Sequence, residues 1–178
     1  SGQNMYGVLR TTAMAYLGKS GDLALPHMRV PRSSLNSKIG GARRFVAQSW
    51  SFARIKAVGK ALDGSFNDAV LAMCAGALRT YMQKHAELPY DSLKSLVPVS
   101  VRTRGDIDST NSIATITVDL ATNVTDPAKR FQVIKNSVRA GRTLFEGMSP
   151  QEMQLYTMLM TTPGLLTEQL GRTSSPWG

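Results

Sequence analysis

The strongest pattern along the chain is an apolar stripe between residues 65 and 82. Its members recur at helical spacing over about four turns. Ser65 is followed three residues later by Asp68, which is the spacing of a capping box in which Asp replaces the usual Glu. We therefore predict a helix that begins at Ser65 and turns one face to a core, formed by Val70, Leu71, Cys74, Ala75, Leu78, Tyr81 and Met82.

Helical spacing also occurs in four other stretches. Two of them cover residues 5–17 and 51–62. The third begins at Asp126 and Pro127, an N-cap residue and a proline at the first helical position, and its apolar positions are Phe131, Ile134 and Val138. The fourth follows the capping box of Ser149 and Glu152, and its apolar positions are Met153, Tyr156, Leu159 and Met160.

Three segments are predicted to be strands. Residues 43–51 alternate in character, residues 93–102 have the composition of a buried strand, and residues 111–120 alternate most regularly. Pro98 requires an edge, a bulge or a strand start, because its nitrogen has no hydrogen to donate. On the third strand we expect one buried face, with Ala114, Ile116, Val118 and Leu120.

The segment between the first helix and the first strand is different in composition. Residues 18–41 are rich in Gly, Pro and Ser, which predicts an extended connection. A connection of this length is unusual inside one small domain, so we interpret it as a crossover between two lobes. The order of the predicted elements indicates a mixed α/β layered fold with too few strands for a complete large enzyme.

Composition limits the class of protein. The chain has 178 residues, of which 42% are hydrophobic and 19% charged, so it can bury a core as one domain or as one large lobe. The net charge of +9 favours an anionic partner such as a membrane surface, nucleic acid or a phosphorylated cofactor. The basic residues are scattered rather than gathered in a stripe, which disfavours nucleic acid.

Cysteine and hydropathy restrict the location. Cys74 is the single cysteine, which excludes an intrachain disulfide framework and a cysteine-rich zinc site and makes the reducing cytoplasm the default. No apolar run approaches the roughly 20 residues that span a bilayer, and a secretory signal pattern is missing. We expect a cytoplasmic protein that is at most peripheral to a membrane.

The sequence contains no complete catalytic constellation. His27 and His85 each lack a partner at metal-ligand spacing, so structural roles are expected and no metal site is predicted. Asp106 and Asp108 are interpreted as hydrated loop acids. The nucleophile elbow and the glycine-rich phosphate-binding loops are missing. The Met-rich stretch from 153 to 160 fits a lipid tunnel, although core packing is the commoner explanation.

Several strings, taken together and in order, resemble one protein family. They are PRSSLNSKIGGARR (31–44), SFNDAVLAMCAGALRTYM (65–82), LKSLVPVSVR (93–102), NSIATITVDL (111–120) and the helix that contains DPAKRFQVIK. Their order and spacing resemble the bacterial wax ester synthase/diacylglycerol acyltransferase family over roughly residues 5–170. This resemblance implies a chloramphenicol-acetyltransferase-like fold of the CoA-dependent acyltransferase superfamily, with two lobes that face one another across a tunnel.

The resemblance also implies a reaction. A fatty acyl group passes from acyl-CoA, a co-substrate, to a fatty alcohol or a diacylglycerol, and the product is a wax ester or a triacylglycerol. In the family the general base is the second His of an HHxxxDG motif in the N-terminal lobe, and this motif is missing here. We therefore expect residues 1–42 to be a helix and interlobe linker, and residues 43–178 to be part of the C-terminal lobe, inactive alone.

The supporting site candidates are Asn67 and Asp68. Capping explains Ser65 and Asp68, but a cap does not require Asn67. By resemblance, the Asn-Asp pair lies near the tunnel, where Asn67 either supports the wall or orients a substrate carbonyl or the catalytic His of the opposite lobe. The sequence leaves open which Lys or Arg contacts CoA.

Two other classes of function remain beside the acyltransferase. One is a non-catalytic lobe that binds acyl-CoA or lipid. The other, less favoured, is a basic nucleic-acid-binding domain, which requires a steep salt dependence of DNA affinity. The resemblance therefore implies as partners acyl-CoA, the acceptor alcohol or diacylglycerol, and an N-terminal lobe that carries HHxxxDG, without nucleic acid. It also makes the surface of the inner membrane or of lipid droplets a peripheral alternative to a free cytoplasmic location.

Overall fold

The structure of the chain is a computed structural model. It describes residues 10, 13–14, 17, 21–24, 31, 33–36, 40–101, 112–146, 148–149 and 151–159, and the fold is given for these residues. Most of the predicted first helix and linker lies outside them. The same holds for His27, Asp106, Asp108 and Met160.

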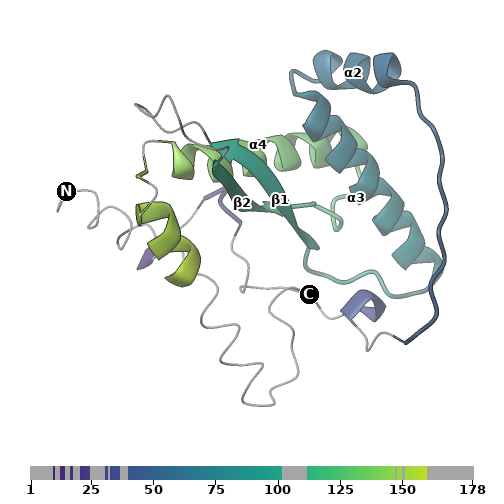
Figure 1. The fold of residues 1–178 in the computed structure, drawn as a ribbon. Coiled ribbons are helices and arrows are strands. Elements are labelled where there is room, and N and C mark those ends of the chain that lie inside the picture. The colour runs from purple at the N-terminus through teal and green to yellow at the C-terminus, as the bar shows by residue number, and fades with distance from the viewer. Residues whose placement is uncertain are drawn as a thin grey trace.

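The described residues form an α/β unit in which helices pack on one antiparallel hairpin (Figure 1). The hairpin consists of β1 (Lys94–Val101) and β2 (Ser112–Asp119), in a register that pairs Lys94 with Asp119 and Val101 with Ser112. Helix α4 (Pro127–Phe145) packs on β2, α3 (Phe66–Lys84) packs on α4, and α2 (Phe52–Ala61) packs on α3. A short 3-10 turn, η1 (Ser34–Asn36), precedes them, and the predicted fold class is confirmed.

The core lies where the hairpin meets α3 and α4. Its fully buried members include Met82 of α3, Ile116 and Val118 of β2, and Ile134 of α4. The predicted inward faces of β2 and α4 are therefore confirmed. Gly141 allows α4 to approach β2 closely, because a Cβ there would lie 3.0 Å from the Cβ of Ile116.

The predicted apolar face of α3 is only partly buried. Ala75 and Met82 are inside, but Cys74 is exposed and Tyr81 remains 46% exposed. The placement of Cys74 on a buried face was wrong because the apolar stripe is wider than the surface that α2, α4 and the hairpin cover. Among the described residues, Pro98 lies on a strand that pairs on one side only, which agrees with the predicted edge position.

Local capping fixes the helix starts at the predicted residues. The hydroxyl of Ser51 accepts a hydrogen bond from the Arg54 amide at the start of α2. The Ser65–Asp68 capping box opens α3, and the carboxylate of Asp126 caps α4. Ser149 and Glu152 make reciprocal bonds before the helical residues 151–159. These starts are set by side chains within three residues of each other.

Asp126 gives α4 a pH-dependent cap. Hydrogen bonds from the backbone N–H groups of Lys129 and Ala128 hold the pKa of Asp126 below its ordinary value of 3.8. Its contribution to stability is therefore complete above that value and is lost as the pH falls through the lowered pKa. We therefore expect the stability of Asp126→Asn to fall less steeply with decreasing pH than the stability of the unchanged chain. The denaturant midpoint, measured between about pH 5 and pH 2, checks this difference. An unchanged pH profile in the variant would contradict the assignment.

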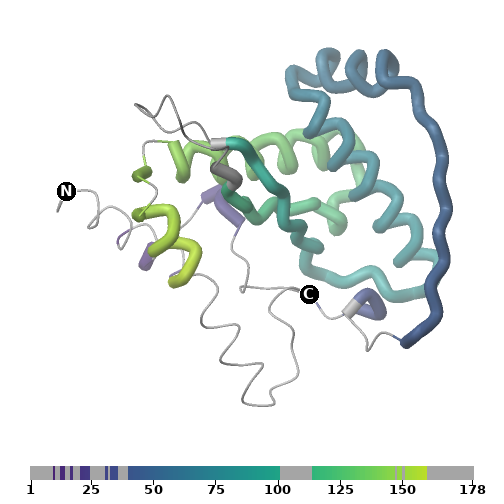
Figure 2. Tube along the Cα trace, viewed as in Figure 1, coloured from purple at the N-terminus to yellow at the C-terminus, as the bar shows by residue number. Residues whose placement is uncertain are grey.

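Residues 43–51 do not form the predicted strand. They run as an extended connection along the outer side of α3, without a ladder to any described residue (Figure 2). All of their side chains are exposed. Within the described part of the chain, no helix is long and apolar enough to cross a membrane.

Candidate functional site

The site begins at the tight turn between α2 and α3. Asp63 has a φ of 55°, and Gly64 follows it. A Cβ on Gly64 would lie 2.6 Å from the ring of Phe131, so the turn rests directly on α4. The turn is further held by Lys135, whose ammonium donates to the carbonyl of Asp63 at 3.2 Å.

The capping box orients Asp68 at the first turn of α3. Its Oδ2 accepts hydrogen bonds from the backbone N–H and from the hydroxyl of Ser65, both at 2.7 Å. The amide of Asp68 donates to the Ser65 Oγ at 3.1 Å. Asp68 is only 5% exposed, and among the described residues its Oδ1 has no hydrogen-bond partner. A buried carboxylate oxygen without a partner is unfavourable, so the cap holds Asp68 at some cost in hydrogen bonding.

Asn67 does not line the pocket that lies beside Asp68. Its side chain is half-buried and lies outside the lining of that pocket, because neighbouring helical residues project about 100° apart. In the described part of the chain its amide makes no hydrogen bond. The structure therefore separates the two candidates: Asp68 is held by the cap, whereas Asn67 is unconstrained by it.

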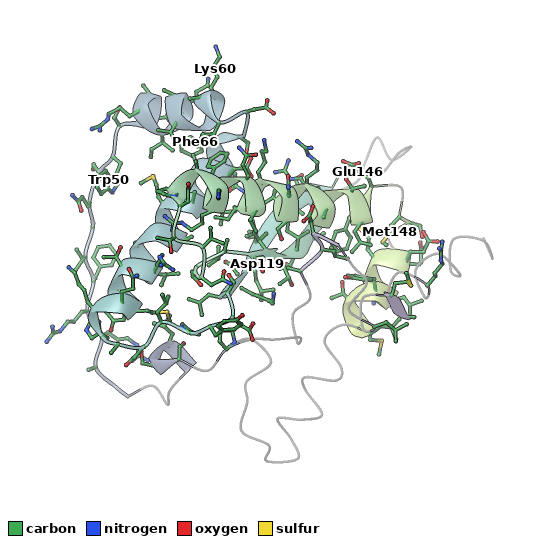
Figure 3. The ribbon with its side chains drawn as sticks, turned by 180° about the vertical axis from the view of Figure 1, so that it is seen from behind. Trp50, Lys60, Phe66, Asp119, Glu146 and Met148 are labelled. Carbon is green, nitrogen blue, oxygen red and sulfur yellow. The ribbon has the colours of Figure 1, made fainter. Side chains whose placement is uncertain are left out.

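A pocket of about 260 Å³ lies between the start of α3 and the outer face of α4. Gly64, Ser65 and Asp68 form one wall. The opposite wall carries a row of basic residues one helical turn apart, so that they share one face of α4; the row consists of Lys135, Arg139 and Arg142. Glu146 also lines the pocket, and it lies at the C-terminal end of α4, where Figure 3 labels it.

Some charged side chains of the pocket have partners within the described residues, and others have none. Lys135 forms an ion pair of 3.5 Å with Asp63, and Asp68 is bonded to Ser65. Arg139 and Arg142 are exposed, and their guanidinium groups make no hydrogen bond or ion pair to the described residues. Each guanidinium presents a planar fork of N–H donors that suits phosphate oxygens, and two such groups lie within one turn of the helix.

A second pair of cations holds the loop after β2. Arg79 donates to the carbonyl of Thr122 at 2.6 Å, and Arg130 donates to the carbonyl of Val124 at 2.9 Å. Burial lowers the pKa of the Arg130 guanidinium, and the neighbouring Arg79 acts in the same direction. This pair fixes the loop between β2 and α4 and therefore the start of α4.

The remaining sequence candidates lie away from the pocket. His85 caps the C-terminal end of α3, with its Nδ1 2.8 Å from the carbonyl of Tyr81, as the predicted structural role requires. The length of α3 separates it from Asp68 by roughly 25 Å, so it cannot serve that site as a base. Within the described ranges, no cluster of His, Cys, Asp or Glu is suited to a metal ion.

Sequence reasoning missed the basic row on α4. The signal was the recurrence of Lys135, Arg139 and Arg142 on one face, opposite the predicted apolar face of the same helix. Interpreting the bases as scattered over the chain concealed this local grouping. Its proximity to Ser65 and Asp68 depends on the packing of α3 against α4, which the sequence pattern alone does not specify.

Two family models match separate parts of the chain. The wax ester synthase/diacylglycerol acyltransferase catalytic domain matches residues 3–70. The C-terminal domain of the same family matches residues 109–176. Asn67 and Asp68 lie within the first range, and the basic row of α4 lies within the second.

Known proteins agree with this assignment. A putative diacylglycerol O-acyltransferase of Mycobacterium tuberculosis is 40% identical over 144 residues, which are 81% of this chain and 32% of the relative. O-acyltransferase WSD of Acinetobacter baylyi is 35% identical over 155 residues, which are 87% of this chain and 33% of the relative.

A solved structure supplies the comparison of folds. It is the wax ester synthase/diacylglycerol acyltransferase from Marinobacter aquaeolei VT8, which matches with a TM-score of 0.70 and 32% identity over 98% of this chain and 36% of that one. The chain thus spans about a third of the length of the curated relatives that it matches. By sequence and by fold, the chain belongs to the wax ester synthase/diacylglycerol acyltransferase family.

Proposed function

We propose that this chain is part of an O-acyltransferase that moves a fatty acyl group from acyl-CoA to a fatty alcohol or a diacylglycerol. The observation that carries the proposal is that both family models match, in order, around the packed unit of α3 and α4. The relatives named as diacylglycerol O-acyltransferases and as O-acyltransferase WSD support it. The product is a triacylglycerol or a wax ester.

The proposed reaction is an acyl transfer between a thioester and an alcohol. The acceptor oxygen attacks the thioester carbonyl while its proton passes to a histidine, and the bond between the carbonyl carbon and sulfur then breaks. The thiolate leaves and takes up a proton, which gives the ester and free CoA. The histidine belongs to the HHxxxDG motif expected in another lobe, because no described histidine lies near the pocket.

The start of α3 supplies the supporting part of this site. We assign Asp68 to holding the helix start, because its Oδ2 accepts hydrogen bonds from the amide and the hydroxyl of Ser65. We assign Asn67 to orienting the carbonyl or the catalytic histidine with its unengaged amide. The division at residue 42 between linker and C-terminal lobe remains a prediction.

The exposed arginines of α4 are proposed to bind the phosphate groups of acyl-CoA. Arg139 and Arg142 line the pocket from the side opposite Asp68 and make no ion pair with the described residues. Arg139→Ala combined with Arg142→Ala is expected to weaken palmitoyl-CoA binding about tenfold, as the loss of solvent-screened charge-assisted hydrogen bonds predicts. Calorimetric titration at two salt concentrations measures this effect.

Two variants of the same region control for charge. Lys56→Ala combined with Lys60→Ala removes two cations from α2, which does not line the pocket, and is expected to leave the affinity unchanged. Glu146→Gln removes the acid at the far side and is expected to strengthen binding. Equal losses from the α2 and α4 variants would assign the effect to net charge and refute a specific phosphate site.

A chimera tests the proposed activity. This chain replaces the matched region of the Acinetobacter baylyi O-acyltransferase, and release of CoA is measured with palmitoyl-CoA and either hexadecanol or dioleoylglycerol. Turnover with either acceptor supports the proposal. A chimera with the circular dichroism of a folded protein but no turnover with any long-chain acceptor refutes it. If such a chimera still binds palmitoyl-CoA, the non-catalytic binding lobe replaces the acyltransferase. A cytoplasmic or lipid-surface location remains a prediction.

A further inference from the structure

We propose that Arg79 and Arg130 bind a phosphate ion in the space that Gly76 leaves open on α3. We call this the arginine-pair site. It lies between α3 and the loop that joins β2 to α4, which contains Thr122 and Val124. The proposal concerns anion binding by this chain itself and does not depend on acyltransferase activity.

Both arginines contact the same loop, and neither has an acidic partner. Arg79 donates to the carbonyl of Thr122, and Arg130 donates to the carbonyl of Val124. The ion pairs found in the described ranges involve other residues, so no carboxylate neutralises either guanidinium there. Asp126 attracts Arg130 at longer range, but its carboxylate is held by amides of α4. The two cations therefore lie close together without a counter-charge.

Arg130 is buried beyond what its hydrogen bonds compensate. It is 8% exposed, and its Nε is a buried donor without a hydrogen-bond partner in the part of the chain that the structure describes. Burial and repulsion by Arg79 both lower the pKa of the Arg130 guanidinium. A buried charge is costly unless it is paired, so an anion beside this guanidinium would remove part of that cost.

Gly76 leaves space beside the same guanidinium. It lies in the interior of α3, where glycine destabilises a helix relative to alanine. Packing does not require a glycine there, because a Cβ would meet only the Nη2 of Arg130, at an ordinary contact distance of 3.5 Å. This Nη2 makes no hydrogen bond to the described residues. The open space at Gly76 therefore gives an anion access to a donor that the loop does not use.

Phosphate suits the donors around this space. Arg79 lies one turn after Gly76 on the same face of α3, so both guanidiniums face that side of the helix. The hydroxyl of Thr125 accepts a hydrogen bond from Arg79 at 3.0 Å and keeps its own hydrogen for an anion. A phosphate group carries a charge of about −1.5 to −2 at pH 7, and its oxygens fit guanidinium forks. A carboxylate offers a single charge to two cations.

The arginine-pair site is separate from the pocket on α4. Arg139 follows Arg130 by about 13–14 Å along the helix axis, and steps of 100° per residue place the two side chains on opposite faces. A phosphate at the arginine pair is therefore a second ligand, distinct from the CoA phosphates assigned to Arg139 and Arg142. It would hold the loop after β2 and, through it, the start of α4.

The denaturant midpoint measures this binding, because a ligand of the folded state raises the midpoint. Every sample carries Arg139→Ala and Arg142→Ala, so that these two arginines of the pocket contribute no phosphate binding. Inorganic phosphate is compared with chloride and with acetate at the same pH and ionic strength. We expect the midpoint to rise with the concentration of phosphate and to stay unchanged with the other two anions. No rise with phosphate, or an equal rise with acetate, would overturn the proposal.

Matched variants separate the site from general salt effects, since phosphate also stabilises folded proteins by exclusion from their surface. Arg79→Gln should weaken phosphate binding about tenfold in calorimetric titration, because it removes one charge-assisted donor. Lys84→Gln removes one charge from the exposed end of α3 and should leave the affinity unchanged. An equal loss of affinity in both variants would assign the effect to net charge and refute the site.

Substitutions of Gly76 test the open space without changing charge. Gly76→Leu fills the space and should abolish phosphate binding, whereas Gly76→Ala adds only the tolerated Cβ and should keep it. Circular dichroism shows that each variant is folded. Full phosphate affinity in a folded Gly76→Leu variant would contradict the proposed position of the anion. Because no turnover is measured, failure here leaves the proposed activity untouched.

Discussion

Asn67→Ala is expected to reduce the turnover of the chimeric acyltransferase by about 10²- to 10³-fold, the range observed when a donor to a developing charge is removed. The fold should tolerate the change. The Asn67 side chain is half-buried in the first turn of α3, and the cap is made by Ser65 and Asp68 without it. Steady-state kinetics with palmitoyl-CoA and denaturant unfolding measure the two quantities.

Two other positions on α3 calibrate this result. Asp68→Ala removes the acceptor of two hydrogen bonds from Ser65, so it should lower turnover and also the free energy of unfolding by about 1–2 kcal/mol. Gln83→Ala changes an exposed amide at the far end of the helix and should alter neither quantity. If Asn67→Ala and Asp68→Ala lower the free energy of unfolding equally, Asn67 only supports the wall of the tunnel and does not orient a reacting group.

Phe131→Ala is expected to produce the largest loss of stability in the described part of the chain. Its ring is 1% exposed and lies against Gly64, so it joins α4 to the turn that begins α3. Truncating a buried Phe typically destabilises a protein by about 3–5 kcal/mol. Denaturant unfolding followed by circular dichroism measures the difference.

A neighbouring position on the same helix supplies the control. Val133 is 39% exposed, and Val133→Ala should destabilise the chain by less than about 1 kcal/mol. If Phe131→Ala and Val133→Ala lower the free energy of unfolding equally, the loss comes from helix propensity and not from the packing of Phe131 against Gly64. If Phe131→Ala also weakens palmitoyl-CoA binding, the contact at Gly64 positions the pocket as well as the core.

Much of this fold follows from short-range patterns. The starts of α2, α3 and α4 were predicted correctly because Ser51, Ser65 and Asp126 satisfy backbone groups within three residues. The inward faces of β2 and α4 followed from periods of two and 3.6 residues, which report burial directly. The capping role of Asp68 was found in the same way.

Features that depend on residues far apart in the sequence could not be predicted from these patterns. The exposure of Cys74 and of residues 43–51 depends on which surfaces neighbouring elements cover, and a single sequence does not specify that area. Ser65 and Arg139 line the same pocket because α3 packs on α4, although the residues of the hairpin separate the two helices in the sequence. The unpartnered Oδ1 of Asp68 likewise emerged only from three-dimensional geometry.

The sequential packing of this unit has a consequence for its synthesis. The hairpin closes between adjacent strands, α4 returns onto the strand before it, and α2 packs on the helix that follows it, whereas the contact of α3 with α4 spans the hairpin in sequence. Local contacts of this kind favour rapid folding, and translation adds residues at roughly 5–20 per second. We expect the layer of α2, α3, β1, β2 and α4 to form soon after α4 leaves the ribosome, while the side chains of residues 43–51, made earlier, are still exposed. Chaperones that recognise exposed aromatic segments should therefore contact the nascent chain at Phe45 and Trp50 during that interval.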